Sequence, residues 1–367
     1  MSPQKYHRYN PDYAVAPGET VKELLENRCM SQSDLASRAN RPVKTINEII
    51  NGKAAITPET AIQFEKILGQ PASFWLNLEN NYREQLARLE EIESLKEQED
   101  ILKSIPVRHM VEYGWIKEQQ DKPSLVRELQ VFFGVSDLNN IDKAGAASVA
   151  WRKTDKFIAD KWALTAWLRK GEIDSAETIC GSFDKSKFKT ALCKIREFTQ
   201  RVDDAVWTDI VKLCAECGVS VVYVRELPKL RANGATYWLD KKPVIQLSLR
   251  HKKNDILWFT FFHEVAHILL HGKKGIFVEF DNGDNVKEQE ADNYAAEMLI
   301  PAKEYKNFID GQDITKQAII QFAHTLKIAP GIVVGRLQHE NKIEISWFND
   351  LKVPLRWATQ RPNKKPR

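Results

Sequence analysis

Residues 261–271, FFHEVAHILLH, decide how the C-terminal part of this 367-residue chain folds. His263 and His267 stand four positions apart, so on a helix both imidazoles share one face and can reach one tetrahedral ion. Glu264 follows the first histidine, where a carboxylate can take a proton from metal-activated water. The other letters are apolar, so the stretch predicts a buried helix, from about residue 255 to 271, that carries a zinc site.

The third zinc ligand is expected on a second helix, in the stretch EQEAD at residues 288–292. Glu288 and Asp292 are again four positions apart, so Glu288 can bind zinc while Asp292 accepts the N–H of a ligand histidine. Glu290 is a competing third ligand, and Glu288 is preferred because it shares its helix face with Asp292. A carboxylate ligand with an aspartate one turn later is the gluzincin arrangement.

Two neighbouring positions refine this expectation. Position 273 is Lys273, which excludes the extended pattern HExxHxxGxxH. His271 continues the face of the two histidines by one turn, and we expect it to support the ligands or line the rim instead of binding the ion. A buried helix with incidental histidines is the alternative, but two histidines and a glutamate buried without partners would cost free energy.

Short β-rich runs precede this helix, and the expected fold class is α+β, mainly helical, with a small sheet beside the HExxH helix. The expected strands are residues 220–225, 235–239, 244–248 and 343–348, and further helices are expected at 286–300, 315–326 and 331–340. The segment 233–238, NGATYW, is either an edge strand along which a peptide could pair or an ordinary sheet strand. Tyr237 and Tyr294 are open candidates for donors to an oxyanion.

Residues 18–78 are expected to form five short helices. Ser31 and Thr57 are suitable N-caps, Pro42 is expected at the first position of the third helix, and Gly69 ends the fourth. Two helices joined by a tight turn are the helix-turn-helix arrangement, in which the start of the second one enters a major groove. The apolar residues expected to pack these two helices together are Leu35, Ala36, Ile46 and Ile49.

The middle of the chain carries little chemistry. Residues 81–105 are rich in Glu and contain no Gly or Pro, which predicts a solvated linker helix, with a dimerising coiled coil as the alternative. Residues 106–215 are expected to be mainly helical, with core tryptophans at positions 151, 162, 167 and 207. The expected divisions are a helix-turn-helix domain at 1–80, the linker at 81–105, the helical region at 106–215, a zinc domain at 216–350 and a basic tail at 351–367.

Bulk composition, 43% hydrophobic and 28% charged, is that of an ordinary globular protein. No run reaches about 18 apolar residues and the N-terminus lacks an apolar secretory segment, so we expect a cytoplasmic chain without membrane contact. Residues 1–80 contain nine Lys/Arg and nine Asp/Glu, so DNA binding must rest on the motif instead of bulk charge. The five cysteines are expected to be reduced, because the single CxxC at Cys214 and Cys217 lacks the other two ligands of a structural zinc site.

Several linked motifs carry a family resemblance. NGATYWL, PVIQLSLR, WFTFFHEVAHILLH, EQEADNYAAEMLIP and IAPGIVVGRLQHE resemble the ImmA/IrrE metallopeptidase family over residues 145–345. PGETVKELLE, SQSDLA and INGKAAITPETA, within residues 17–78, resemble the HigA-type antitoxin branch of the XRE helix-turn-helix family. The first resemblance implies a zinc peptidase that acts on regulatory proteins through His263, His267, Glu288 and Glu264.

The second resemblance implies DNA contacts around the helix that begins at Pro42. Cys29 stands where the HigA type usually has Gly, which puts the turn before the second helix in doubt. The implied phosphate contacts are Gln32, Arg41, Asn51 and Lys53, and the implied base-reading residues are Val43, Lys44 and Asn47.

Two hypotheses of function follow. The first is a DNA-binding transcriptional regulator with a zinc-dependent endopeptidase domain, which cleaves a repressor or a toxin–antitoxin partner by zinc-activated water. The second is a HigA-like antitoxin or repressor in which the zinc fold is a sensor or protein-binding scaffold without proteolysis. The expected partners are Zn²⁺, double-stranded operator DNA and a protein substrate or toxin, and palindromic operators favour a homodimer.

Overall fold

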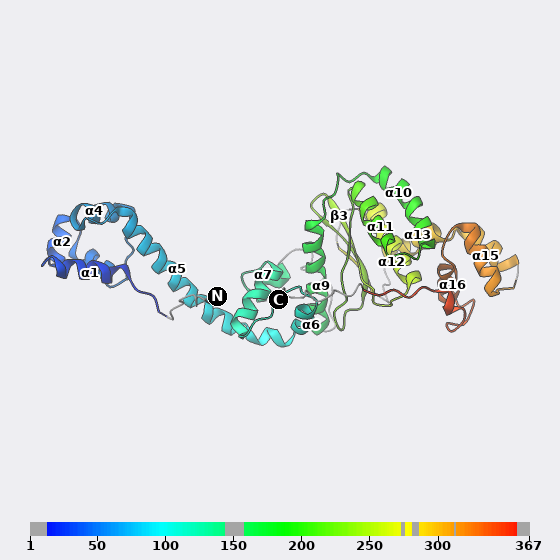
Figure 1. Ribbon diagram of the computed structural model, residues 1–367, viewed down its shortest axis with the longest axis horizontal. Coiled ribbons are helices and arrows are strands. Elements are labelled where there is room, and N and C mark those ends of the chain that lie inside the picture. The colour runs from blue at the N-terminus through cyan, green and yellow to red at the C-terminus, as the bar shows by residue number, and fades with distance from the viewer. Residues whose placement is uncertain (1–12, 144–157, 273–275, 281–285, 312, 358–367) are drawn as a thin grey trace, which may run out of the picture. The chain divides into compact units, whose positions relative to one another are not determined.

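A computed structural model describes residues 13–143, 158–272, 276–280, 286–311 and 313–357 (Figure 1). The chain divides into two compact units, residues 1–99 and 100–367. Trp151, Lys273 and residues 358–367 of the expected basic tail lie outside the described residues. The expected fold class is confirmed, because helices dominate and the strands form one small sheet.

The first unit is helical, and capping chemistry sets its helix boundaries. Ser31 Oγ accepts from the backbone N–H of Asp34 at 3.1 Å, and the Asp34 carboxylate accepts from the N–H of Ser31 at 3.1 Å. Thr57 also caps its helix as expected, whereas Pro42 is an N-cap, so the third helix begins one residue later than expected. The helices are α1 (Pro17–Asn27), α2 (Gln32–Arg38), α3 (Val43–Ile50), α4 (Pro58–Leu68) and α5 (Ala72–Glu97).

The core of this unit closes around a close crossing of α1 and α3. Leu35, Ala36, Ile46 and Ile49 are buried in it, as the sequence predicted. A Cβ added to Gly18 would lie 2.1 Å from the carbonyl oxygen of Ile50. Only glycine therefore permits this crossing.

One long helix, α5, replaces the last of the five short helices expected within residues 18–78 and most of the separate linker helix expected after it. Asn80 and Asn81 do not stop it, since neither glycine nor proline follows. Near its start Glu79 is buried and accepts from the N–H of Ile56 at 3.1 Å and from Arg83 Nε at 2.7 Å. The bond from Ile56 attaches the beginning of α5 to the core of the first unit.

The second unit contains a mixed four-stranded sheet with the order β1-β3-β2-β4. β1 and β3 are parallel, and β2 runs antiparallel to both β3 and β4. Three strands match expected ones, whereas β4 was not predicted. The strands are β1 (Ser220–Tyr223), β2 (Ala232–Leu239), β3 (Lys242–Leu247) and β4 (Phe277–Phe280).

Helices cover both faces of the sheet, as Figure 1 shows. On one face α9 (Ile158–Glu177) packs its buried Trp167 against the sheet. On the other face α12 (Asn254–Ala266) and α11 (Ala205–Glu216) share the largest apolar core with α10 (Lys185–Glu197). Earlier in the chain lie η1 (Glu99–Lys103), α6 (Val107–Glu112), α7 (Lys122–Phe133) and η2 (Leu138–Lys143), and η3 (Phe198–Gln200) follows α10.

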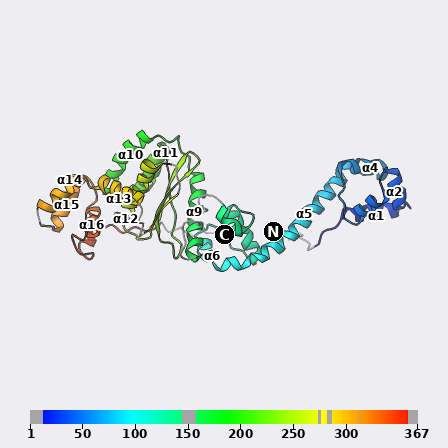
Figure 2. The same ribbon diagram turned by 180° about the vertical axis from the view of Figure 1, so that it is seen from behind.

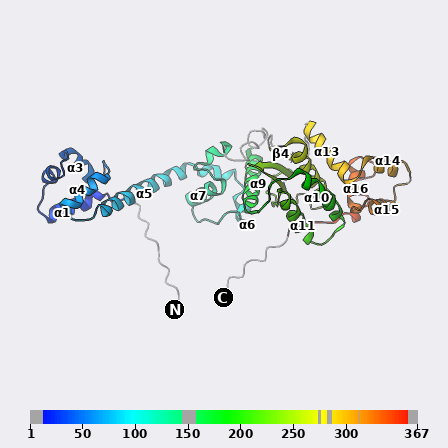
Figure 3. The same ribbon diagram turned by 90° about the horizontal axis from the view of Figure 1, so that it is seen from above.

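The expected metal-binding helix is present with a change of winding. After α12 the helix continues as a π-helical turn, η4 (His267–His271), and this helix ends at Gly272. α13 (Val286–Leu299) packs along α12, and β4 lies close to α13 (Figure 3). The group α14 (Ala302–Gly311), α15 (Lys316–Leu326) and α16 (Pro330–His339), seen from behind in Figure 2, contacts α12 through α16.

The C-terminal residues return to the start of α12. The strand expected at 343–348 is wrong: this segment forms turns before η5 (Asn349–Leu351), and Gln338 Nε2 donates to the carbonyls of Ile345 and Trp347 at 2.9 Å each. Lys352 then forms a buried ion pair with Asp255 at 2.6 Å. Residues 349–357 are thus packed into the second unit.

No single helix among the described residues is long and apolar enough to cross a bilayer. The bent pair α15 and α16 reaches that length and apolar composition only when the two helices are taken together.

Candidate functional site

Three side chains from α12, η4 and α13 converge on one point. His263 Nε2 lies 3.0 Å from Glu288 Oε2 and 3.0 Å from His267 Nε2. His267 Nε2 lies 3.4 Å from the same Glu288 oxygen. The sequence placed the two histidines together through their spacing, and the packing of α13 on α12 brings Glu288 to both.

The chemistry and spacing of these donors fit a zinc ion. Two imidazole nitrogens and one carboxylate oxygen are a common protein ligand set for catalytic zinc, with the fourth position open. In a tetrahedron with ligand bonds of about 2.0–2.1 Å the donor atoms are about 3.3 Å apart. The three distances here, 3.0, 3.0 and 3.4 Å, agree with that value to within a few tenths of an ångström.

Each histidine has a partner for its other ring nitrogen. His263 Nδ1 lies 2.9 Å from Asp292 Oδ1. A carboxylate there holds the proton on Nδ1 and leaves the Nε2 lone pair for a metal. The sequence proposed this role for Asp292, and the two side chains lie within hydrogen-bond distance.

His267 is held by two further side chains in a row, His271 and then Glu290. The sequence predicted a supporting role for His271 alone. His267 Nδ1 lies 2.9 Å from His271 Nδ1, and His271 Nε2 lies 2.9 Å from Glu290 Oε2. Glu290, weighed from sequence as a rival ligand, therefore contacts His271 instead of the three-donor cluster. The π-helical turn shifts the register between His267 and His271, which the linear sequence did not indicate.

Glu264 is fully buried directly beneath strand β2. A Cβ added to Gly234 would lie 2.5 Å from Glu264 Oε1, and Thr236 Oγ1 donates to the Glu264 backbone carbonyl at 3.0 Å. The glycine lets the β2 backbone approach this carboxylate closely. The strand thus fixes the position of the residue next to His263.

Burial and hydrogen bonding shift the acidities of two donors. Burial lowers the pKa of His267, and the hydrogen bond with Glu288 opposes that shift. Burial alone would raise the pKa of Glu288, but hydrogen bonds with His263 and His267 lower it to about 2. Both side chains are therefore deprotonated at neutral pH, the state that binds a metal ion.

Strand β4 is the outer strand beside this cluster. Phe277 at its start stacks on the His267 ring with centroids 4.3 Å apart and an interplanar angle of 11°. The alternative that residues 233–238 form an edge strand is wrong, because β2 pairs with β3 on one side and β4 on the other. The Tyr237 hydroxyl is buried and donates to Gln246 Oε1 at 3.0 Å, so it is not an oxyanion donor.

The candidate DNA-binding residues lie around α3 in the first unit. Val43, Lys44 and Asn47 are exposed on α3. Asn47 Nδ2 donates to Gln32 Oε1 at 3.3 Å, and Asn51 Nδ2 donates to Asn47 Oδ1 at 3.0 Å. These three amides form one polar row between the start of α2 and the end of α3.

The two remaining candidates for DNA contacts, Lys53 and Arg41, differ in their exposure to solvent. Lys53 is exposed after α3, whereas Arg41 is half-buried and its Nε donates to Gln63 Oε1 on α4 at 3.0 Å. Cys29, where the resembling family has glycine, adopts a φ of +48°, the left-handed region that glycine enters without strain. The turn before α2 is therefore made with a cysteine in a backbone conformation that favours glycine.

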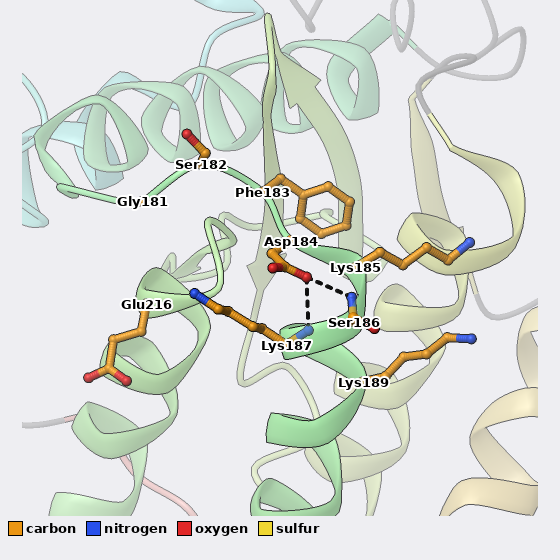
Figure 4. Close-up of a pocket in the computed structure, with 9 residues that line it drawn as sticks. All are labelled: Gly181, Ser182, Phe183, Asp184, Lys185, Ser186, Lys187, Lys189 and Glu216. Carbon is orange, nitrogen blue, oxygen red and sulfur yellow. Dashed lines mark hydrogen bonds between the residues drawn. The ribbon is translucent and has the colours of Figure 1, made fainter.

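A hollow of about 780 Å³ lies at the start of α10, and its lining includes none of the three metal-binding candidates (Figure 4). Asp184 accepts there from the N–H groups of Ser186 and Lys187 at 2.9 and 3.0 Å. Lys185 donates to the carbonyl of Leu269 at 2.8 Å, which supports the π-helical turn. The lining side chains diverge in Figure 4 instead of meeting at a point.

Two protein families match this chain. The helix-turn-helix family matches residues 21–75, and the IrrE N-terminal-like domain, a peptidase family, matches residues 217–338. The first match spans α1 to the beginning of α5, and the second spans the sheet, α12, α13 and α16.

Individual relatives match a smaller part of the chain. The HTH-type transcriptional regulator YddM of Escherichia coli (strain K12) is 34% identical over 64 residues, which are 17% of this chain and 68% of the relative. Virulence-associated protein A of Dichelobacter nodosus is 35% identical over 68 residues, 18% of this chain and 67% of its own. A solved addiction module antidote protein of the HigA family from Coxiella burnetii is 33% identical, covers 24% of this chain and 92% of its own, and has a TM-score of 0.20.

Proposed function

Since the chain belongs to the helix-turn-helix family through residues 21–75 and carries an IrrE N-terminal-like domain at 217–338, we propose that it is a DNA-bound zinc endopeptidase. Its substrate is a regulatory protein, a repressor or a toxin–antitoxin partner. We place the chain in the cytoplasm, where it can reach operator DNA.

One observation carries the peptidase part of this proposal: His263, His267 and Glu288 bring three donor atoms within 4.8 Å of one another. These residues would hold the zinc ion. Bound there, zinc would supply a Lewis acid that polarises the scissile carbonyl and acidifies water. A site with three protein ligands leaves a coordination position open, as catalytic zinc sites do and closed structural sites do not.

The chain's own residues supply the proton transfer and the orientation. Glu264 accepts the proton of the attacking water at its carboxylate and passes it to the leaving amine. Asp292 and the pair His271 and Glu290 hold the two histidines in the tautomers that leave Nε2 free. Strand β4 offers its outer edge to an extended peptide, a common way in which proteins bind unfolded segments.

Metal content tests the site first. Purified wild type should contain about one zinc per chain, and Glu288→Ala should lose it. Glu264→Gln should keep the metal and lose cleavage of a bound regulatory protein, since only the proton acceptor is changed. A wild-type chain without zinc after back-titration, or a Glu264→Gln chain that still cleaves, would contradict the peptidase proposal.

A second candidate function is a HigA-like antitoxin or repressor whose zinc fold senses or binds a protein without cutting it. The exposed face of α3, with Val43, Lys44 and Asn47, favours operator binding in either case. Operator repression that survives Glu264→Gln and is lost in Asn47→Ala would support this second function when no cleavage is found. Both functions require that Lys44→Ala weaken binding at matched salt.

A further inference from the structure

A cavity of about 400 Å³ lies between α12, α13 and α16. This volume is within the roughly 300–1,000 Å³ of ligand pockets in proteins. Three half-buried side chains and three buried ones form most of its apolar wall: Ile256, Phe259, Ala296, Leu299, Ile300 and Ile332. Polar residues with exposed side chains, Asn293 and Glu340 among them, stand at its rim.

The cavity adjoins the three-donor cluster. Asp292 belongs to both, because it lines the cavity while its Oδ1 lies 2.9 Å from His263 Nδ1. Thr260, also in the lining, precedes Glu264 by four residues, and a Cβ on Gly234 would meet Thr260 Cγ2 at 2.7 Å and Glu264 Oε1 at 2.5 Å. One helical turn, about 5.4 Å along the axis, therefore separates Thr260 in the cavity wall from Glu264 on α12.

The charged groups of the lining already have partners, two pairs of opposite charge and one hydrogen bond from the neutral His263 ring to Asp292. The pairs are Asp255 with Lys352 at 2.6 Å, Asp292 with His263 at 2.9 Å and Arg336 with Glu340 at 3.0 Å. Arg336 also donates to the carbonyl of Ile300 at 2.6 Å and lies over the Tyr305 ring. A further charge placed against the apolar wall would lose its hydration at a cost in free energy, whereas an uncharged apolar group would bury surface there.

We propose that this cavity takes a large uncharged side chain, aliphatic or aromatic, of the residue next to the peptide bond that is cut. This inference rests on the proposed peptidase function. A side chain that enters between Ile256 and Ala296 meets apolar wall, while its backbone remains near Glu264, one turn away. Ala296 has the smallest side chain in the apolar wall, so its size sets how much of the cavity is open.

Binding to the metal-free chain tests the cavity without relying on cleavage. N-acetyl-leucinamide and N-acetyl-phenylalaninamide should give saturation-transfer NMR signals at millimolar concentration, and N-acetyl-lysinamide should not. Ala296→Leu should weaken both at least tenfold, whereas Ala302→Leu, the same change at an exposed alanine of α14, should not. Equal binding of the lysine derivative, or unchanged binding in a folded Ala296→Leu chain, would overturn the inference.

A second variant covers the case in which Ala296→Leu fails to fold, as judged by circular dichroism. Ile256→Ala enlarges the cavity from the opposite wall. It should shift the preference toward the phenylalanine derivative at least threefold. A folded Ile256→Ala chain with an unchanged preference would count against the cavity as the binding site.

Cleavage profiling separates failure of the cavity from failure of the peptidase. Zinc-loaded wild type is given a proteome-derived peptide library, and cut positions are read by mass spectrometry. Wild type should cut beside large apolar residues. Ala296→Leu should cut beside small residues instead. Cleavage without that preference overturns the cavity inference alone. If no peptide is cut but the amides still bind in a way that depends on Ala296, the peptidase function is overturned. The assignment of the cavity to a side chain of a cleaved substrate is then overturned with it.

Discussion

Gly234 on β2 and Glu264 on α12 touch so closely that a Cβ at position 234 would lie 2.5 Å from Glu264 Oε1. No ordinary side-chain contact is that short, so the strand and the helix meet only because residue 234 is a glycine. The approach presses the backbone of a central strand onto the proposed proton acceptor. Backbone geometry far from position 264 in sequence thus holds the carboxylate in place.

Gly234→Ala should therefore displace the Glu264 carboxylate. We expect a loss of stability of roughly 1–3 kcal/mol, as for other overpacked cores, and a loss of cleavage larger than the loss of zinc. Thermal unfolding and metal content measure the two effects. Gly311→Ala is the control, because nothing lies within 4 Å of a Cβ at that position; equal effects of the two changes would contradict this account.

Asp292→Asn should weaken zinc binding while the fold is retained. The amide can no longer hold the proton on His263 Nδ1 by a charge-assisted bond, and loss of such partners costs roughly 10–100-fold in metal affinity. Competition with a chromophoric chelator measures the affinity. Asp310→Asn, at an exposed aspartate of α14, should leave it unchanged. An Asp292→Asn chain with wild-type affinity would remove the orienting role.

Stability of the metal-free chain should fall as pH falls below about 6.5, the ordinary pKa of histidine. Burial lowers the pKa of His267 in the folded chain. As the pH falls, the unfolded chain therefore takes up its proton first, which stabilises the unfolded state. The contribution of His267 to the free energy of unfolding is complete above the pKa that this histidine has in the unfolded chain. It is lost between that pKa and the lower pKa of the folded chain, by at most about 1.4 kcal/mol per pH unit.

Chemical denaturation from pH 8 to pH 5 checks this dependence. His267→Gln should flatten the curve, and His324→Gln, at an exposed histidine, should not. A curve that is equally steep in wild type and His267→Gln would show that other groups cause the loss.

Cys29→Gly should stabilise the first unit. Cys29 is exposed and has a φ of +48°, so little packing is lost and a left-handed strain of roughly 1–2 kcal/mol is relieved. The greater freedom of glycine in the unfolded chain offsets part of the gain, which leaves a rise of about 0.5–1 kcal/mol. Denaturation of the full chain, followed through the transition of the first unit, measures it.

The matched control for this change is Cys193→Gly. Cys193 is also exposed but lies inside α10, where glycine costs about 1 kcal/mol relative to good helix formers. The two substitutions should therefore change stability in opposite directions. The same sign at both positions would refute the role of backbone conformation.

Local sequence determined the parts of this protein that depend on nearest neighbours along the chain. Four-residue spacing placed His263 with His267 and Glu288 with Asp292 on common helix faces, because one helical turn brings those positions together. Capping residues such as Ser31 and Thr57 gave the helix starts, since each satisfies backbone N–H groups within its own turn.

Tertiary structure alone decided what depends on segments distant in sequence. The four-residue strand β4, the attachment of Glu290 to His271, and the cavity between α12, α13 and α16 each need a partner brought in by packing. The strand expected at residues 343–348 failed for the same reason, because Gln338 takes the carbonyls that a neighbouring strand would have used. Periodicity describes one element's faces, whereas pairing and packing depend on which other element lies against them.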